Sequence, residues 1–227
     1  MDCRDGQEVA VRCVCRQHRT RRVAARAARI PPRYAACTLD GFELWNPGDP
    51  TLRRARDRAR EFVEVYPAVE KGLLFVGGAG TGKTHLATAV LRELVDRKGA
   101  TGLYVDMLDL IQQLQMSFES TSITREAILA PVVQAEVLVL DELGAGKVSP
   151  WVMDLIYYII NTRYMRRRVT ICTSNYRDTS GKAGEETLAD RVSARVRSRL
   201  FEMCTVVELR GTDFRQRVLA EKEGRRS

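Results

Sequence analysis

Before residue 209, short apolar runs alternate with longer segments in which apolar residues recur at helical spacing. Five runs predict strands that are buried on both faces, at 72–76, 103–105, 137–140, 169–173 and 205–209. The other segments predict helices at 51–66, 83–98, 107–118, 150–166 and 186–201, the first of them capped by Thr51. Strands that alternate with helices predict an α/β fold, with one parallel sheet and helices on both of its faces.

The first 36 residues show a different pattern, rich in Arg and without long apolar runs. They carry nine Arg and three acidic residues, a net charge of +6, whereas the net charge of the whole chain is +8. Such a short segment cannot bury a core alone, and Pro31 and Pro32 interrupt any helix that would continue from it. We therefore predict a basic, Cys-containing arm at 1–36, a linker and lead-in helix at 37–70, and a main α/β domain at 71–227.

The composition narrows the class of protein. With 227 residues, of which 44% are hydrophobic and 29% charged, the chain suffices for one globular domain and an appendage. No apolar run reaches the roughly 20 residues of a membrane span, and the N-terminus lacks the apolar core of an export signal. These features predict a cytoplasmic protein with reduced thiols. The basic arm favours a polyanion partner or a docking role, the alternative being a generally Arg-rich composition.

The turn after the first predicted strand carries the strongest chemical signal. It reads Gly77-Gly78-Ala79-Gly80-Thr81-Gly82-Lys83-Thr84 and fits the phosphate-binding pattern G-x-x-x-x-G-K-[ST]. The glycines let backbone N–H groups surround phosphate oxygens, and the N-terminus of the next helix favours an anion. We expect Lys83 to reach the β- and γ-phosphates of ATP and Thr84 to bind Mg²⁺. The alternative, a tight turn with an incidental Lys, leaves the fit to the whole pattern unexplained.

Two carboxylates follow the third predicted strand. Because the carboxyl ends of parallel strands meet at one edge, Asp141 and Glu142 are expected beside the phosphate-binding turn. Asp141 is expected to hold Mg²⁺ through water, and Glu142 to orient and deprotonate the attacking water. A solvated strand end is the alternative reading of the same pair.

Further candidates follow the fourth strand and lie on the last predicted helix. Asn175 ends the fourth strand and is expected to contact the γ-phosphate or the attacking water, the alternative being a turn-forming Asn. Arg195 and Arg199 share one helix face because they are four residues apart, whereas Arg197 points the other way. Arg199 is expected to complete a neighbouring subunit's site, since an added Arg accelerates phosphoryl transfer strongly. The alternative is a set of solvated Arg side chains.

Several motifs together resemble the DnaC-type helicase loaders of the AAA+ ATPases and their relatives, the IstB transposition helpers. The similar segments are Gly80-Thr81-Gly82-Lys83-Thr84-His85-Leu86-Ala87, Leu140-Asp141-Glu142-Leu143-Gly144, Thr173-Ser174-Asn175-Tyr176, Arg197-Ser198-Arg199-Leu200 and Gly211-Thr212-Asp213-Phe214-Arg215. The resemblance covers residues 30–217, and it makes 71–227 an AAA+ ATPase domain. It implies a five-stranded sheet in the order 5-1-4-3-2, with little or no helical lid because few residues follow the last strand.

The same resemblance implies roles for individual residues. Arg199 becomes the finger that acts in trans in a homo-oligomer, and Arg195 its supporting partner. Asn175 falls on the first sensor position, and Arg215 is a weaker candidate for the second sensor. His85 extends the phosphate-binding motif and is counted with the nucleotide-binding residues.

The basic arm also contains thiols and an imidazole. Cys3, Cys13, Cys15 and His18 are of the types that bind zinc in tetrahedral sites, but their spacing fits no complete template. Relatives in this family carry a Cys-x-x-Cys pair before a Cys-x-Cys pair. Three explanations stay open: a ligand lost through a misplaced start, a decayed site, or His18 as the fourth ligand.

The sequence therefore predicts an ATPase that binds ATP and Mg²⁺, with Zn²⁺ as an additional candidate. The resemblance implies that it loads or remodels a hexameric replicative helicase on single-stranded DNA. Two alternatives remain open: an IstB-like transposition helper, and a nucleotide-gated adaptor with little turnover.

Overall fold

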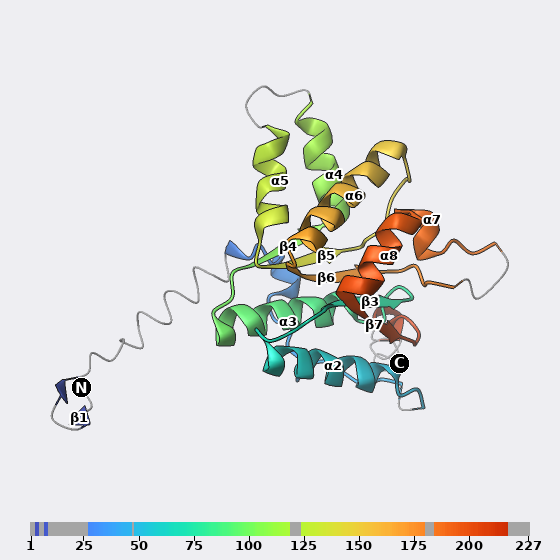
Figure 1. Ribbon diagram of the computed structural model, residues 1–227. Coiled ribbons are helices and arrows are strands. Elements are labelled where there is room, and N and C mark those ends of the chain that lie inside the picture. Colours follow the sequence, from blue (N-terminus) through green and yellow to red (C-terminus); the bar gives the residue numbers. More distant parts are fainter. Residues whose placement is uncertain are drawn as a thin grey trace.

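The computed structural model describes residues 3–4, 7–8, 27–46, 48–118, 124–179 and 184–217. A sheet of five parallel strands lies at its centre, in the order β4-β5-β6-β3-β7 (Figure 1). The strands are β3 (Gly72–Gly77), β4 (Gly102–Asp106), β5 (Val137–Asp141), β6 (Val169–Ser174) and β7 (Cys204–Leu209). Numbered from β3 as the first strand and read from the β7 edge, this is the predicted order 5-1-4-3-2, which is confirmed.

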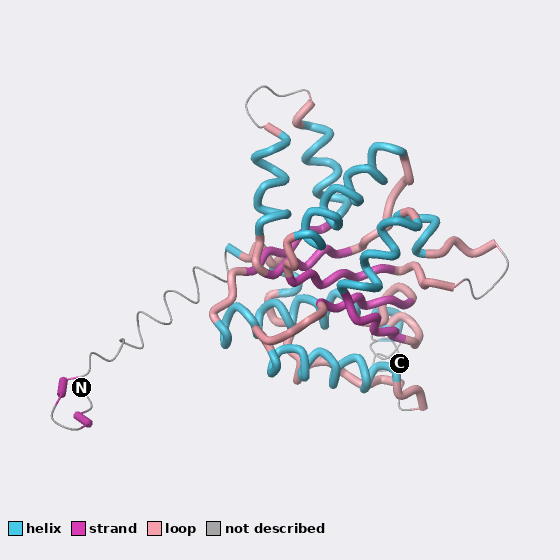
Figure 2. The backbone as a smooth tube through the Cα atoms, viewed as in Figure 1, coloured by secondary structure: helices cyan, strands magenta, loops and turns pink. Residues whose placement is uncertain are grey.

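Helices cover both faces of the sheet, as Figure 2 shows in cyan around the magenta strands. One face packs against α2 (Thr51–Val65) and α3 (Lys83–Lys98). The other packs against α4 (Met107–Met116), α5 (Arg125–Gln134), α6 (Pro150–Met165), α7 (Leu188–Val192) and α8 (Ala194–Met203).

Each strand of the sheet contributes apolar side chains to both cores. In β3, Leu73 and Phe75 point into the core under α2 and α3, whereas Leu74 and Val76 point into the core under the other helices. All four side chains are at most 5% exposed. This burial explains why the sequence shows continuous apolar runs rather than strict alternation.

The segment before α2 packs against the same domain. Ala28, Leu39 and Phe42 are buried in the core under α2 and α3, and the carbonyl of Ala28 accepts a hydrogen bond from the Tyr104 N–H at 2.7 Å. A short 3₁₀ helix, η1 (Pro32–Tyr34), lies between these contacts in the sequence. The predicted divisions at residues 36 and 70 remain a prediction. At the start of the chain, β1 (Cys3–Arg4) pairs antiparallel with β2 (Gln7–Glu8).

Three details differ from the sequence-based expectation. Thr51 does not cap α2: Pro50 is the N-cap residue, and Thr51 Oγ1 accepts a hydrogen bond from the Arg210 N–H at 3.0 Å. The helix predicted at 186–201 is two helices, α7 and α8, because Ser193 lies between them at φ 79°. Helix α5 was not predicted, since it contains Pro131 and its apolar residues follow no clear helical stripe. Within the described part of the chain, no helix is long and apolar enough to span a membrane.

Candidate active site

The carboxyl ends of β3, β5 and β6 bring the predicted site residues together. The turn after β3, Glu142 after β5 and Asn175 after β6 all border one cavity of about 380 Å³. Its described lining consists of Arg33, Tyr34, Cys37, Gly41, Phe42, Glu43, Trp45, Ala79, Gly80, Gly82, Lys83, Thr84, His85, Glu142, Thr173, Asn175, Phe214 and Arg215. Residues from distant parts of the sequence therefore share one concave site, as expected at the carboxyl edge of an open α/β sheet.

The turn after β3 needs glycine at two positions. Gly80 and Gly82 have φ values of 70° and 95°, in the left-handed region. A Cβ atom on Gly82 would lie 2.6 Å from the Phe42 ring, and one on Gly80 would lie 1.9 Å from Asp213 Oδ1. Thr81 is fully buried and donates from Oγ1 to the Gly78 carbonyl at 2.9 Å, so its hydroxyl stabilises the turn from inside.

Lys83 is the first residue of α3 and borders the cavity. Its Nζ donates a hydrogen bond to the Gly78 carbonyl at 2.7 Å, so the ammonium group is folded back onto the turn. Burial lowers the pKa of Lys83 to about 8, although the charges of Asp141 and Glu142 oppose the shift. A buried ammonium beside free helix N–H groups forms an electropositive cradle that fits a polyphosphate.

Asp141 is held by three hydroxyl groups. Thr84 Oγ1 and Thr173 Oγ1 donate to its Oδ1 at 3.0 and 2.5 Å, and the Tyr104 hydroxyl donates to its Oδ2 at 2.6 Å. The carboxylate is 2% exposed. A carboxylate and a Thr hydroxyl in contact are the oxygen donors that Mg²⁺ prefers, so the residues present fit this ion. Tyr104 and Thr173 had no predicted role, although Thr173 lies two residues before Asn175.

Glu142 lies at the turn that follows β5. Its φ is 56°, uncommon for a residue with a side chain, and its N–H donates to Thr173 Oγ1 at 3.0 Å. The next N–H, that of Leu143, donates to the Thr173 carbonyl at 2.8 Å. Burial raises the pKa of Glu142, and the charges of Asp106 and Asp141 add to the shift. A carboxylate with a raised pKa beside a phosphate cradle is suited to accept a proton from water.

Arg215 reaches the cavity from the segment after β7. Its guanidinium forms an ion pair with Asp213, with Nε and one terminal nitrogen 3.1 and 3.2 Å from the two carboxylate oxygens. The Phe214 N–H donates to the Gly80 carbonyl at 3.2 Å, which places this segment against the phosphate-binding turn. Arg215 thus borders the cavity while it is paired with a neighbouring carboxylate, and its role as a second sensor stays a prediction.

Aromatic rings also line the cavity, and we call Phe42, Trp45 and Phe214 the aromatic wall. The Trp45 ring centroid lies 5.9 Å from that of Phe42 and 5.0 Å from that of Phe214, and Phe42 lies edge-on to His85 at 5.5 Å. His85 Nε2 donates to the Thr38 carbonyl at 2.8 Å, which orients its ring. No site role was predicted for these rings, because Phe42 and Trp45 precede the turn by more than 30 residues and Phe214 follows it by 130.

Arg195 and Arg199 lie elsewhere. Arg199 Nε donates to Asn161 Oδ1 at 2.9 Å, and the guanidinium carbon lies 5.2 and 5.7 Å from the ring centroids of Tyr157 and Tyr164. Arg195 is exposed, and its carbonyl accepts a hydrogen bond from Arg199 at 3.2 Å. Neither side chain is part of the described lining of the cavity.

The predicted zinc ligands cannot be placed. Cys13, Cys15 and His18 lie outside the described residues, and for Cys3 only the backbone of β1 is described. Among the residues whose side chains are described, no group of three or more His, Cys, Asp and Glu has metal-binding geometry. The described thiols are Cys172 and Cys204, which are buried, and Cys37, which is half-buried.

Comparison with known proteins identifies the family of the chain. The model of the IstB-like ATP binding protein family matches residues 7–222. The replicative helicase loader DnaC of Escherichia coli K12 is 27% identical over 161 residues, which cover 70% of this chain and 64% of DnaC. DnaC of Buchnera aphidicola from Acyrthosiphon pisum is 31% identical over 166 residues, with 72% and 64% covered. The matched region therefore spans slightly less than two thirds of these relatives.

A solved structure has a fold similar to that of this chain. The crystal structure of the DnaC helicase loader has a TM-score of 0.68 and 35% sequence identity, and the match covers 79% of this chain and all of that one. This chain itself has the strand order that the resemblance implied and the phosphate-binding turn expected from the sequence. The chain therefore belongs to the IstB-like ATP-binding protein family, the AAA+ family that also includes the DnaC-type helicase loaders.

Proposed function

We propose that this protein hydrolyses ATP and that its nucleotide state controls a replicative helicase on single-stranded DNA. One observation carries the first part of the proposal. Lys83, Glu142 and Asn175 border a single cavity, with Thr84 in contact with Asp141 at its floor. A phosphate cradle, an oxygen pair for Mg²⁺ and a buried carboxylate base are the parts that phosphoryl transfer to water requires.

Lys83 and the turn bind the phosphates. For Lys83 to reach a phosphate, its Nζ exchanges the Gly78 carbonyl for a phosphate oxygen, a stronger partner because it is charged. Thr84 and Asp141 hold the Mg²⁺ ion, which neutralises charge on the phosphates when it is bound. Tyr104 and Thr173 keep the Asp141 carboxylate in one orientation.

Glu142 and Asn175 act on the attacking water. Glu142 accepts a proton from this water. The pKa of the Glu142 carboxyl group is raised toward neutral pH, which makes the carboxylate a stronger base. The Asn175 amide orients the water or the γ-phosphate from the end of β6. Arg215 adds a cation once a phosphate competes with Asp213 for its guanidinium.

Arg199 completes the site of a neighbouring subunit in a homo-oligomer, with Arg195 in support. Within its own chain, Arg199 is held by Asn161 and two Tyr rings and stays outside the cavity lining. A guanidinium presented on α8 in this way is available to a second copy, and such a finger accelerates hydrolysis by about a thousandfold or more.

The partners of the proposal come from the relatives and from charge. Two curated relatives are named replicative helicase loaders, and the first 36 residues carry a balance of +6 that favours a polyanion or an acidic surface. Single-stranded DNA binding should weaken as salt rises, because Lys and Arg contacts to phosphate release counterions.

A transposition helper is the second candidate function. The matching family model is IstB-like, and a Geobacillus stearothermophilus protein assigned as an ATP-binding protein of insertion sequence IS5376 is 26% identical, covering 89% of this chain and 76% of that protein. The same site would then act on a transposase and its target DNA. A nucleotide-gated adaptor with little turnover is the third.

Hydrolysis of ATP by the full chain, measured across protein concentration with and without single-stranded DNA, tests the proposal. We expect turnover to rise faster than linearly with concentration and to change with DNA. Lys83→Ala should lose nucleotide binding, Glu142→Gln should bind ATP without hydrolysing it, and Arg199→Ala should bind normally and hydrolyse slowly. Full activity of an isolated monomer would contradict the trans role, and binding without turnover under all conditions would favour the adaptor.

A second experiment separates the two DNA-linked candidates. In a pull-down, the Glu142→Gln variant with bound ATP is the bait. The two candidate partners are a purified replicative helicase and the transposase encoded beside an IstB-like gene. Lys83→Ala, which should not bind ATP, is the control. Retention of the helicase alone supports the proposal. Retention of the transposase alone would replace helicase control with the transposition role.

A further inference from the structure

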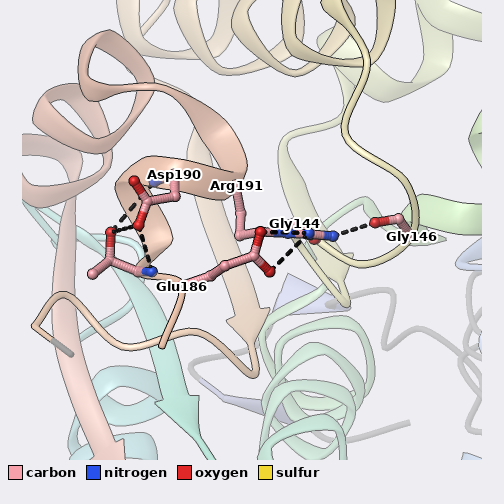
Figure 3. Close-up of polar contacts among 6 residues, drawn as sticks. Gly144, Gly146, Glu186, Asp190 and Arg191 are labelled. Atoms are coloured by element: carbon pink, nitrogen blue, oxygen red, sulfur yellow. Dashed lines mark hydrogen bonds and ion pairs between the residues drawn. The ribbon is translucent and has the colours of Figure 1, made fainter. Parts of the chain in front are cut away.

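Arg191 on α7 has a nearly buried guanidinium whose nitrogens all have partners (Figure 3). Its Nε donates to the Gly144 carbonyl at 2.8 Å, and one terminal nitrogen donates to the Gly146 carbonyl. The other terminal nitrogen lies 3.1 Å from a carboxylate oxygen of Glu186. The side chain is 10% exposed. This Arg is thus built into the fold and is not a solvated surface charge.

The two carbonyls belong to the loop that carries Glu142. Gly144 and Gly146 have φ values of 85° and 79°, so the backbone turns sharply directly after the candidate base. A Cβ atom on Gly144 would lie 3.0 Å from Arg191 Cβ, which shows how closely α7 approaches this loop. We define residues 142–146 as the base loop.

The base loop is fixed at both ends by different elements. At its start, the N–H groups of Glu142 and Leu143 donate to Oγ1 and the carbonyl of Thr173 in β6. At its end, Arg191 holds the carbonyls of Gly144 and Gly146. Without this guanidinium, the carbonyl of the buried Gly144 would be left without its donor, which is costly for a buried acceptor, whereas the exposed Gly146 can bind water instead.

Arg191 also contacts the segment that follows Asn175. Its guanidinium carbon lies 4.7 Å from the ring centroid of Tyr176, the residue after Asn175. One side chain therefore touches both strand-end segments that border the cavity beside the phosphate-binding turn. Its planar fork can bind two carbonyls and stack on a ring at once, which a Lys ammonium cannot do.

We propose that Arg191 is a positioning residue that sets the orientation of Glu142 within its own subunit. This inference deepens the proposed ATP hydrolysis and rests on it. Arg191 is not among the described residues that line the cavity. It acts by holding the base loop, so its loss should slow the chemical step and leave nucleotide binding at Lys83 and Thr84 in place.

Steady-state kinetics of Arg191→Met and Arg191→Lys provide the first test, with Arg197→Met as the matched control. Arg197 lies on the next helix, is half-buried, is ion-paired with Asp178 and stacks on Phe201 at 4.5 Å, but it contacts no part of the base loop. We expect kcat to fall about tenfold to a hundredfold in Arg191→Met, as a slight misplacement of a catalytic group does, with KM nearly unchanged. Arg191→Lys should retain only slightly more of the wild-type kcat than Arg191→Met does.

Mixing of variants provides the second test, because α7 leads directly into α8 and its candidate finger. Arg191→Met subunits keep an intact Arg199, whereas Arg199→Ala subunits keep an intact base loop. If Arg191 acts within its own subunit, mixed oligomers regain part of the lost turnover. Absence of any recovery would overturn the proposal, since it would mean that Arg191 acts on the finger alone. An equal loss of kcat in Arg197→Met would also overturn it.

Amide hydrogen exchange distinguishes failure of this inference from failure of the proposed function. Exchange in peptides that cover 142–146 should rise in Arg191→Met relative to wild type and Arg197→Met, whether or not the protein hydrolyses ATP. Peptides of β3 and α3 serve as internal controls for global unfolding. Unchanged exchange in the base loop would reject the positioning role even if the wild type proves to be an ATPase.

Discussion

Tyr104 donates a buried hydrogen bond from its hydroxyl to Asp141 Oδ2 at 2.6 Å, across the adjacent strands β4 and β5. Tyr104 is 6% exposed and Asp141 2%. Burial, together with the charge of Asp141, raises the pKa of the tyrosine, so the phenol stays protonated and remains a donor. The bond occupies one carboxylate oxygen and leaves Oδ1 facing Thr84.

Tyr104→Phe should weaken the response to Mg²⁺. The ring stays, so packing is preserved, but the carboxylate of Asp141 loses the donor that fixes its orientation. Loss of such an outer-shell partner costs about tenfold or more in metal affinity at well-studied sites. We expect the Mg²⁺ concentration for half-maximal hydrolysis to rise several-fold, while nucleotide binding in EDTA matches wild type. An unchanged Mg²⁺ titration would show that Tyr104 serves packing alone.

As the pH is lowered, the rate of hydrolysis should start to fall at a higher pH than it would if the base were a Glu with an ordinary pKa. The base must be ionised to accept a proton, and the pKa of Glu142 is raised by burial and by Asp106 and Asp141, while Lys83 and Arg215 lower it. The rate therefore falls as the pH drops through this raised pKa, above the usual value of about 4.3. A profile of kcat/KM against pH measures this pKa in the free protein.

Asp106→Asn offers a matched control for this pH dependence. Asp106 caps α4 by accepting from the Leu108 N–H at 2.8 Å, and Asn retains the capping oxygen without the charge. The acid limb of the kcat/KM profile should then move to lower pH. A limb that stays in place would exclude Glu142 as the titrating group or Asp106 as a cause of its shift.

Nucleotide affinity should decline above pH 8. Burial holds the pKa of Lys83 at about 8 in the free protein, and bound phosphates must raise it because they favour the charged form. Binding therefore takes up a proton at alkaline pH, and affinity falls by up to about tenfold per pH unit until the pKa of the complex is reached. Calorimetry of ADP binding in buffers of different ionisation enthalpy measures the proton directly. Lys83→Arg should abolish the proton uptake, because Arg stays charged.

Arg163→Met should destabilise the fold strongly. Arg163 is fully buried and donates to neutral acceptors: Thr170 Oγ1 at 2.9 Å and the carbonyls of Val132, Ala135 and Val169 at 3.0, 2.9 and 2.6 Å. Burial lowers the pKa of Arg163 to about 10. Loss of the guanidinium leaves these acceptors unpaired, at about 1–3 kcal/mol each where no water replaces it, so we expect a loss of at least about 3 kcal/mol.

Urea denaturation followed by circular dichroism measures this loss, with Arg166→Met as the control. Arg166 is exposed and lies three residues further along the chain, just after α6, so its replacement should change the free energy of unfolding by less than about 0.5 kcal/mol. Equal stability of the two variants would mean that water replaces the Arg163 hydrogen bonds.

Features that depend on consecutive residues were predictable from the sequence. The short, mostly apolar runs identified all five strands to within one residue at each end, because strands of a sheet that is covered on both faces are rich in apolar residues. The phosphate-binding turn was readable for the same reason, since its glycines, Lys83 and Thr84 are contiguous. The strand order came from the family resemblance and not from the pattern.

Contacts between segments far apart in the chain were decided only by the tertiary structure. The hydroxyl of Tyr104 on Asp141, the aromatic wall at Phe42 and Phe214, and the grip of Arg191 on the base loop each join residues at least 37 positions apart. Each of these side chains could equally be an ordinary core or surface residue. The residues next to it in the sequence therefore do not indicate that it belongs to the site. The sequence determined which groups could do chemistry; packing of both helical layers against one sheet determined which of them meet.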